Sequence, residues 1–416
     1  IGKRGRMSRV WIAHLSYGPM HVARLDACQN HASHRYIAVS ASQSQRDYGW
    51  ERQGDDRIVA LEAERDFDDV PAAEWNARIA ALWETAPPDV VCVAGYSHSS
   101  MLSLIRICLD RRVPWVVMGD SQHVDRRRFV WREYLKARVV RSASSALVAG
   151  TPHVDYFHSL GVNRDHIFTG YDVVDNAYFA KRAESVKDSE LGFLLTCSRF
   201  LPKKNLFRVL SAYQAYVQMC EQRSGSHCRD FVLLGDGELR SDLIGHATRL
   251  GLRVRSDTCL EEVRDHAKAG GKPTIFLPGF RQIHELSWYY ANAVALVHAS
   301  TSEQWGLVVN EAMASGLPVI VSHRCGCAMD LVRDDVNGWI FEPRDVDALA
   351  ECMFRVSIMP DSMRSKMGLA SKAIIEEWGP ERFADGIGQA VDCALRTGPR
   401  SSTFLDRALV ATLQRR

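Results

Sequence analysis

Short apolar stretches alternate with longer helical stretches along the first part of the chain. Segment 56–86 is polar and is expected to be helical, as are residues 99–111 and the basic segment 126–141. The expected strands are RVWIAHLS, RYIAVSAS, DVVCVAG, VPWVVMGD and SALVAG. Apolar strands separated by helices are typical of βαβ units with a parallel sheet. Residues 7–175 are therefore predicted to form a Rossmann-like domain.

A second series of the same kind follows the polar segment 170–192, which we interpret as a linker. Its expected strands are FLLTCS, FVLLG, TIFLPG, AVALVHAS and PVIVS, with helices expected at 205–222, 238–250, 282–291 and 306–315. This pattern predicts a second Rossmann-like domain over 190–380 and a helical tail, 381–416, that packs back toward the N-terminal domain. The fold class is thus α/β, with two Rossmann-like domains facing a central cleft.

The composition excludes several classes of protein. Lys and Arg number 52 against 50 Asp and Glu, a net charge of +2 that argues against a dedicated nucleic-acid binder. No apolar run approaches the length of about 18 residues that a membrane-spanning helix needs. Eleven scattered cysteines make a poor disulfide framework, so a reducing cytoplasm is the expected location.

The segment HASTSEQWGLVVNEAMASGLPVIVS, 298–322, places two carboxylates around an apolar stretch. We expect Glu303 in the loop after a buried strand and Glu311 in the second turn of the following helix. Between them, the backbone N–H groups of Trp305, Gly306 and Leu307 would form a first turn that suits a phosphate. Each carboxylate can accept two hydrogen bonds from a diol. A phosphate flanked by two diols describes a nucleotide sugar. The alternative is that Glu303 is an ordinary acid at a helix N-terminus and Glu311 a residue on the solvated face of that helix.

A basic loop strengthens this interpretation. In TCSRFLPKKNLFRVL, Arg199, Lys203 and Lys204 follow a strand, and Asn205 is the expected N-cap of the next helix. Fixed cations at this place suit a diphosphate leaving group without a metal. In LLGDGELR, Gly235 and Gly237 are expected to let a ligand approach the backbone, but the third glycine of the dinucleotide fingerprint is missing.

These residues resemble the retaining family-4 glycosyltransferases of the GT-B fold, strongly over 192–380 and in outline before that. The carriers of the resemblance are EQWGLVVNEAMASGLPVI with its E-x7-E spacing, SRFLPKKN, LPGF and NGWIFEPRDVDALA. The resemblance implies that Arg199 and Lys204 hold the donor diphosphate and that Glu311 holds the ribose. It also implies that Glu303 and the backbone of Trp305 to Leu307 bind the sugar. Gly279 and Phe280 would contact the base. Gln304 and Trp305 depart from the family pattern, which commonly has Gly or Pro after the first Glu and Phe before the Gly, so the donor sugar is not inferred.

The N-terminal half offers fewer candidates. His98 stands near a helix start, roughly where the family often presents a histidine near the reacting sugar, although a histidine there is more often structural. Asp120 ends an expected strand, and Gly18 lies in the loop after the first strand. The segment 126–141 has seven basic residues with aromatic ones among them and is a candidate for peripheral contact with the inner face of the membrane, against the alternative of a solvated helix.

The sequence thus predicts a cytoplasmic, metal-independent retaining glycosyltransferase with no cofactor. Its partners would be a nucleotide sugar donor and a saccharide or lipid-linked acceptor, in cell-surface polysaccharide or glycoconjugate synthesis. The DFD at 66–68 and DVD at 345–347 lie in helix-like contexts, so they are not interpreted as metal-binding motifs. Two alternatives are a nucleotide-sugar 2-epimerase of the same fold and a non-catalytic nucleotide- or carbohydrate-binding protein.

Overall fold

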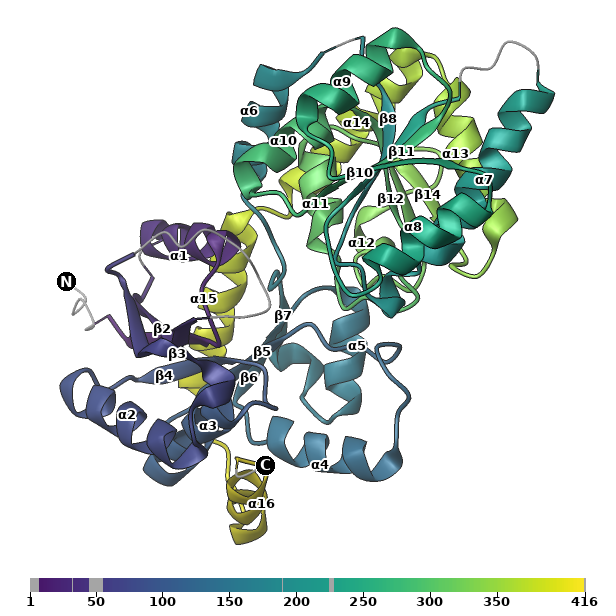
Figure 1. The fold of residues 1–416 in the computed structure, drawn as a ribbon. Coiled ribbons are helices and arrows are strands. Elements are labelled where there is room, and N and C mark those ends of the chain that lie inside the picture. Colours follow the sequence, from purple (N-terminus) through teal and green to yellow (C-terminus); the bar gives the residue numbers. More distant parts are fainter. Residues whose placement is uncertain (1–6, 32, 45–54, 189, 224–227, 415–416) are drawn as a thin grey trace. The chain divides into compact units, whose positions relative to one another are not determined.

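The computed structural model describes residues 7–31, 33–44, 55–188, 190–223 and 228–414. They form two compact units: residues up to 174 together with those from 380 onward make unit 1, and residues 175–379 make unit 2 (Figure 1). Each unit contains one seven-stranded sheet. Among the described residues, no helix has both the length and the apolar character needed to cross a lipid bilayer.

Unit 1 is built on a parallel sheet with the strand order β3-β2-β1-β4-β5-β6-β7. The strands are β1 (Arg9–His14), β2 (Arg35–Ser44), β3 (Ile58–Asp66), β4 (Val90–Ala94), β5 (Trp115–Gly119), β6 (Ser145–Val148) and β7 (Ile167–Thr169). The helices are α1 (Pro19–His31), α2 (Ala72–Thr85), α3 (Ser99–Arg111), α4 (Val130–Val140), α5 (Thr151–Ser159), α15 (Pro380–Thr397) and α16 (Phe404–Gln414).

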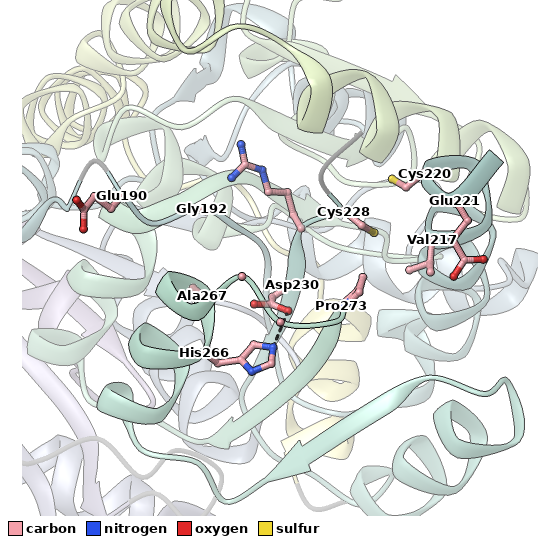
Figure 2. A pocket seen from close by; sticks show the side chains of 13 residues that line it. Glu190, Gly192, Val217, Cys220, Glu221, Cys228, Asp230, His266, Ala267 and Pro273 are labelled. Carbon is pink, nitrogen blue, oxygen red and sulfur yellow. Dashed lines mark ion pairs between the residues drawn. The ribbon is translucent and has the colours of Figure 1, made fainter. Parts of the chain in front are cut away.

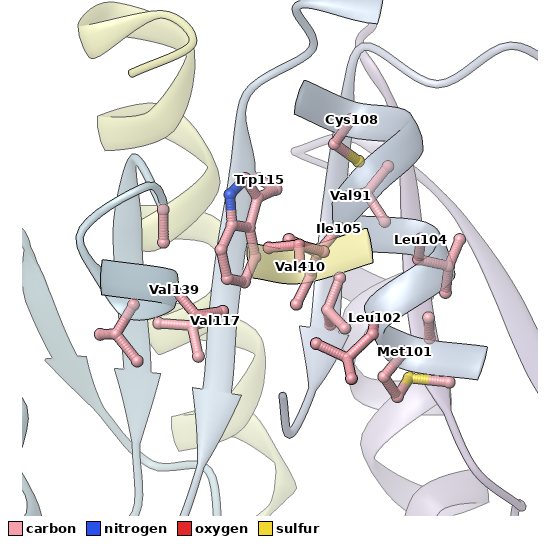
Figure 3. Packing of buried hydrophobic residues seen from close by; sticks show 14 of the residues in the cluster. Val91, Met101, Leu102, Leu104, Ile105, Cys108, Trp115, Val117, Val139 and Val410 are labelled. Atoms are coloured by element: carbon pink, nitrogen blue, oxygen red, sulfur yellow. The ribbon is translucent and has the colours of Figure 1, made fainter. Parts of the chain in front are cut away.

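Helices cover both faces of this sheet, as a buried parallel sheet requires. On one face α2, α3, α4, α5 and α16 pack over Trp11, Val91 and Trp115. Figure 3 shows Val410 of α16 among the side chains of α3 beside Trp115. On the other face α15 covers Val10, Ile12 and Cys92. The last described helices are therefore part of unit 1.

The prediction of a helix over 56–86 is wrong in its first part, because Ile58–Asp66 is the edge strand β3. The segment IVALEAERD is rich in Ala, Leu, Glu and Arg, which favour helices when considered alone. Its pairing with β2, in which Ala38 lies opposite Ile58, overrides that preference. Glu62 secures the strand through ion pairs of 2.8 Å to Arg65 and 2.9 Å to Arg78.

Unit 2 has a second parallel sheet with the order β10-β11-β9-β8-β12-β13-β14. Its strands are β8 (Phe193–Cys197), β9 (Asp230–Leu234), β10 (Arg253–Ser256), β11 (Thr274–Gly279), β12 (Ala293–His298), β13 (Val319–Ser322) and β14 (Gly338–Phe341). Its helices are α6 (Asn176–Val186), α7 (Leu206–Gln222), α8 (Arg240–Arg249), α9 (Leu260–Ala269), α10 (Ile283–Asn292), α11 (Leu307–Ala314), α12 (Ala328–Leu331), α13 (Val346–Ile358) and α14 (Asp361–Glu376). Helices α7, α8 and α13 cover one face (Figure 1).

The boundary between the two units lies between residues 174 and 175, within the segment 170–192 that we interpreted as a linker, and the same segment contains α6. Asp175 caps that helix by accepting a hydrogen bond of 2.9 Å from the N–H of Tyr178. Phe179 and Ala183 are buried, and the ring of Phe179 meets that of Tyr290 edge to face at 6.0 Å. The polar side chains that indicated a linker belong to the exposed face of the helix.

Candidate functional site

The predicted donor residues of unit 2 follow four adjacent strands of its sheet, β11, β9, β8 and β12. The strand order reverses between β8 and β12, since β9 to β11 lie on one side of β8 and β12 to β14 lie on the other. In open α/β sheets, ligands bind at the carboxyl ends of strands at such a switch point. The loops after β8 and β12 carry the basic segment and Glu303, respectively.

Glu303 lies between the two lysines of the β8 loop. Lys203 Nζ is 3.3 Å from its Oε1, and Lys204 Nζ forms an ion pair with Oε2. Ser300 Oγ also donates to Oε2, at 3.0 Å. The Glu303 side chain is 10% exposed and that of Lys204 is 14% exposed. The structure therefore brings one acid and two cations together at the switch point, with Glu303 and Lys204 mostly buried and Lys203 exposed.

Backbone contacts hold these two loops against each other. The N–H of Thr301 donates to the carbonyl of Lys203 at 2.8 Å. Asn205 begins α7, as predicted, but its side chain does not cap the helix. Its Nδ2 instead donates to the carbonyls of Ala299, at 3.1 Å, and Pro343, at 2.6 Å. Asn205 thus ties the β8 loop to the β12 loop.

His298, the last residue of β12, lies beneath the cluster with Nε2 at 3.4 Å from Glu303 Oε2. Burial lowers the pKa of His298, an effect that Glu303 partly opposes, so the imidazole is neutral at neutral pH. Burial acts to raise the pKa of Glu303, but contacts with His298 and the two lysines outweigh it and hold the pKa well below its usual range. Glu303 is therefore ionised, and the lysines supply the compensating charge.

Gly306 is the N-cap of α11 and has φ of +107°, a conformation that favours glycine. A Cβ there would lie 3.3 Å from His298 Nε2, a tight contact that the imidazole would have to relieve by a small shift. The first turn was predicted to contain Trp305, Gly306 and Leu307. In the structure α11 begins at Leu307, and Trp305 lies in the preceding loop. Trp305 is buried, packs against Trp378 with ring centroids 5.1 Å apart, and donates its indole N–H to Asn310 Oδ1 at 2.9 Å.

Glu311 projects from the second turn of α11, as predicted. Its Oε2 accepts a hydrogen bond of 2.6 Å from the hydroxyl of Tyr290. Burial raises the pKa of Glu311 to about 7, against the opposing effect of that hydrogen bond. Cys197, at the end of β8, interacts with both groups. Sequence reasoning missed Tyr290, which carries no signal because it stands in the apolar part of α10.

The predicted glycines divide into two kinds. A Cβ on Gly235 would lie 1.9 Å from the carbonyl oxygen of Ser198, and one on Gly237 would lie 2.7 Å from that of Phe200. The β8 loop thus requires glycine at both positions, and the expectation that they let a ligand approach the backbone stays a prediction. Gly279, by contrast, has φ of +89° with no atom within 4 Å of a Cβ, and Phe280 beside it is 40% exposed.

Arg199 lies in the same β8 loop and is exposed. It stands between Ser198, whose N–H donates to Leu234, and Phe200, whose N–H donates to the carbonyl of Asp236 at 2.7 Å. The loop backbone is thus fixed on both sides of Arg199. Its role at the diphosphate stays a prediction.

The predicted residues of unit 1 follow strands at the carboxyl edge of its own sheet. Gly18 follows β1, and its N–H donates to His21 Nδ1 at 3.0 Å. His98 follows β4, and Asp120 follows β5 and is partly exposed. His98 caps α3 by accepting at Nδ1 from the N–H of Ser100 at 3.2 Å, and its Nε2 lies 3.4 Å from Asp68. Both ring nitrogens of His98 therefore have structural partners.

A buried ionisable cluster that the sequence did not reveal lies at the same edge of unit 1. Arg24 Nη2 is 3.5 Å from Asp172 Oδ1 and donates to the carbonyl of Val173 at 3.0 Å. Burial, with the nearby charge of Asp120, raises the pKa of Asp172 to about 7. Burial, with Arg24, lowers the pKa of His14 to about 3. An acid that can be protonated and a neutral imidazole thus lie beside a fixed cation.

The two DxD segments have structural roles. Asp66 accepts from the N–H of Asp68 at 3.0 Å, and Asp345 accepts from the N–H of Ala348 at 2.8 Å, so both cap helices. Within the described parts of the chain, no group of three or more His, Cys, Asp or Glu side chains is placed to hold a metal ion.

Unit 2 also has a pocket of about 330 Å³ at the opposite, amino edge of its sheet (Figure 2). It is lined by residues that precede β8, begin β9 or precede β11, together with side chains of α7 and α9, and His266 of α9 lies 3.5 Å from Asp230. None of the predicted donor residues lines it. This pocket is therefore separate from the candidate site.

Comparison with known proteins agrees with this geometry. Residues 178–373, just under half of the chain, match the family model described as glycosyl transferases group 1. The sulfoquinovosyl transferase SQD2 of Arabidopsis thaliana is 30% identical over 171 residues, which cover 35% of this chain and 32% of that protein. The chain spans about a quarter to a third of the length of the first curated relatives that it matches.

Solved structures are similar over nearly the whole chain. Sucrose-phosphate synthase from Thermosynechococcus elongatus has a TM-score of 0.67 at 16% identity, covering 92% of this chain and 98% of that chain. Anabaena HepE in complex with UDP has a TM-score of 0.64 at 16% identity, covering 93% and 100%. These likenesses show the fold. The chain has the two-domain GT-B fold, and residues 178–373 match the group 1 glycosyltransferase model, which confirms the resemblance to GT-B glycosyltransferases.

Proposed function

We propose that this protein transfers a sugar from a nucleoside diphosphate sugar to a saccharide or lipid-linked acceptor, with retention of anomeric configuration. The observation that carries the proposal is the cluster of Glu303, Lys203 and Lys204 at the switch point of unit 2. Support for a nucleotide donor comes from the Anabaena structure, which holds UDP. Retention rests on the family resemblance.

The two lysines neutralise the charge of Glu303. A donor diphosphate carries more negative charge and would draw the Lys204 ammonium toward itself, together with Arg199. The carboxylate of Glu303 would then accept hydrogen bonds from sugar hydroxyls in place of its lysine contacts. The ion pair thus keeps Lys204 and Glu303 in place until the diphosphate and the sugar hydroxyls replace their mutual contact.

The reaction breaks the bond between the anomeric carbon and the diphosphate oxygen. Lys204 and Arg199 would stabilise the negative charge that grows on this oxygen, a task that requires no metal ion. The acceptor oxygen forms its bond to the anomeric carbon on the face that the diphosphate leaves, and its proton passes to the departing phosphate oxygen. No cofactor enters this scheme.

Glu311 is proposed to hold the ribose, and Gly279 with Phe280 the base. The open space over Gly279 and the exposed ring of Phe280 support this placement. For unit 1, we propose that the part-exposed Asp120 and the Asp172 cluster serve acceptor recognition. Location in the cytoplasm and a role in cell-surface polysaccharide or glycoconjugate synthesis are part of the same proposal.

Calorimetric titration of UDP, GDP and ADP without added metal tests the site. Wild type should bind one nucleotide, and Lys204→Met should weaken that binding at least about tenfold by loss of one charged contact. Lys187→Met is the matched control, because Lys187 is an exposed lysine of the same unit. Failure of all three nucleotides to bind would contradict the proposal, as would equal effects of the two substitutions.

A second assay separates transfer from the two alternatives. Incubation of the nucleotide sugar without acceptor should leave its sugar unchanged apart from slow hydrolysis. Conversion to an epimer would identify an epimerase. Binding without turnover on any saccharide or lipid-linked acceptor would identify a non-catalytic binding protein.

A further inference from the structure

Exposed apolar side chains are concentrated on one part of unit 1. Of the 15 large hydrophobic residues that are exposed within the described chain, six lie at the start of α4 or the start of α16. Val130 is 89% exposed, Phe404 83% and Leu405 65%. The α4–α16 patch is defined as Phe129, Val130, Trp131, Tyr134, Phe404 and Leu405. Isolated exposed apolar residues are ordinary, whereas a group of large ones marks an interaction surface.

Polar contacts between the two helices hold the patch together. Arg138 of α4 forms an ion pair of 2.6 Å with Asp406 of α16 and donates to Thr403 at 3.2 Å. The same guanidinium donates to the hydroxyl of Tyr134 at 3.0 Å. Arg138 therefore joins the aromatic end of α4 to the residues beside Phe404, although they are far apart in the sequence.

Arginines surround the apolar side chains. Arg126, Arg127 and Arg132 are exposed, and within the described parts of the chain no ion pair joins them to a carboxylate. The guanidinium of Arg132 lies 5.3 Å from the ring of Phe129 and 5.0 Å from that of Trp131, and the guanidinium of Arg127 lies 5.6 Å from that of Phe129. These three arginines give the start of α4 an uncompensated positive charge.

Glu133, the one acid within α4, does not cancel this charge. It accepts from Lys136 at 3.0 Å and from the hydroxyl of Tyr156 at 2.7 Å, on the inner side of the helix. The α4 side chains that face the protein core are Ala137, Val139 and Val140, near the other end of the helix. The outward surface at the start of α4 is therefore both apolar and cationic.

We propose that the α4–α16 patch docks unit 1 onto an anionic lipid bilayer. Aromatic rings and arginines side by side suit the boundary between headgroups and acyl chains, because the rings bury apolar area while the guanidiniums reach the lipid phosphates. Adjacent cations are attracted by the negative surface potential of such a bilayer. A nucleic acid would match the arginines but would leave Val130 and Leu405 in water. This docking does not depend on the proposed transfer activity.

Sedimentation with vesicles tests the proposal on the full-length protein. Wild type should bind vesicles made of equal parts phosphatidylcholine and phosphatidylglycerol, and it should stay in solution with phosphatidylcholine alone. Replacing Arg127 and Arg132 together by Glu should lower the partition coefficient at least about tenfold. Replacing Trp131 and Phe404 together by Ser should also lower it, since apolar insertion is lost.

Matched controls lie in unit 2. Arg249→Glu with Arg253→Glu changes the same charge at exposed arginines, and Met329→Ser with Leu369→Ser removes side chains that are 63% and 66% exposed. Both controls should bind vesicles as wild type does. Absence of wild-type binding, or equal loss in controls and patch variants, would overturn the proposal. So would a wild-type dimer that the patch substitutions convert to a monomer, because the patch would then join two copies of this chain.

Discussion

Lys204 and Glu303 form an ion pair that joins the loop after β8 to the loop after β12. The residues are 99 positions apart in sequence, and the strand order of unit 2 makes their loops neighbours at the switch point. Ser300 and Lys203 complete the same cluster. The acid of the E-x7-E segment and the cations of the basic loop are thus one structural group.

Loss of the cation at Lys204 or at Arg199 should slow catalysis more than it lowers the stability of the fold. Lys204→Ala or Arg199→Ala should lower kcat by about 10²- to 10³-fold, the loss expected when one preorganised donor is removed from the transition state. Steady-state kinetics with the identified donor measures this change, with Lys187→Ala as the control. A change of less than about threefold would remove the residue from this role.

Glu311 should make both stability and donor binding depend on pH. Its pKa is raised from the ordinary value of 4.5 to about 7 by burial. Between these values the folded state holds a proton that the unfolded state has lost, so stability falls as pH rises through this window, by about 3 kcal/mol in total. Glu311→Gln should remove that slope in urea unfolding between about pH 5 and about pH 8.

The same titration should affect the nucleotide. Only ionised Glu311 accepts two hydrogen bonds from the ribose diol, so wild-type affinity should rise with pH up to about 7 and then level off. Glu311→Gln should bind weakly, with little dependence on pH over this range. An unchanged pH profile in the variant would show that another group controls binding.

Trp305→Phe should destabilise unit 2 although it restores a residue common in the family. It leaves the Oδ1 of buried Asn310 without the indole N–H that lies 2.9 Å away, at a cost of about 1–3 kcal/mol. Chemical unfolding measures this loss. The double variant Trp305→Phe with Asn310→Leu should recover part of it, because no polar atom then lacks its partner. Additive losses would show that packing on Trp378 dominates.

Gly235→Ala should be much more damaging than Gly251→Ala. Both glycines have positive φ, +131° and +75°, but only Gly235 would bring a Cβ to 1.9 Å from another residue's carbonyl oxygen. We expect a loss of about 3 kcal/mol or more at Gly235 and about 1 kcal/mol at Gly251. Thermal denaturation of both variants decides this. Similar losses would mean that the β8 loop moves away freely.

Val410→Ala should lower stability by about 2 kcal/mol, because Val410 is 1% exposed and packs in the core of unit 1. Val336→Ala, at a side chain that is 53% exposed, is the control and should change stability little. Equal effects would show that α16 is not part of the cooperative core.

Much of the carboxyl-edge site was predictable because its signals are local. Glu303 and Glu311 share a single strand-loop-helix segment, and Lys204 follows a strand directly, so the sheet rhythm alone places each of them. The contacts that set their properties were not predictable. Tyr290 reaches Glu311 from a separate helix across 21 positions, and nothing near it in sequence marks it as different from core residues.

The errors in the fold have the same origin. The strand β3 contains several good helix formers, and pairing with β2 decides its state. The pattern within 126–141 did not reveal a coherent face, since two of the six residues of the α4–α16 patch come from a helix more than 260 positions later. The periodicity of a short segment does not predict which distant segment packs beside it.

The course of the chain has a consequence for biosynthesis. Residues 175–379 form unit 2 without contribution from either flank, whereas unit 1 takes α15 and α16 from the far side of that segment. A ribosome therefore releases everything unit 2 needs before it has made α15 and α16. The face of β1, β4 and β5 that α15 covers lacks this helix during the interval, so the first segment to be synthesised is the last to be completed and has the longest exposure to chaperones.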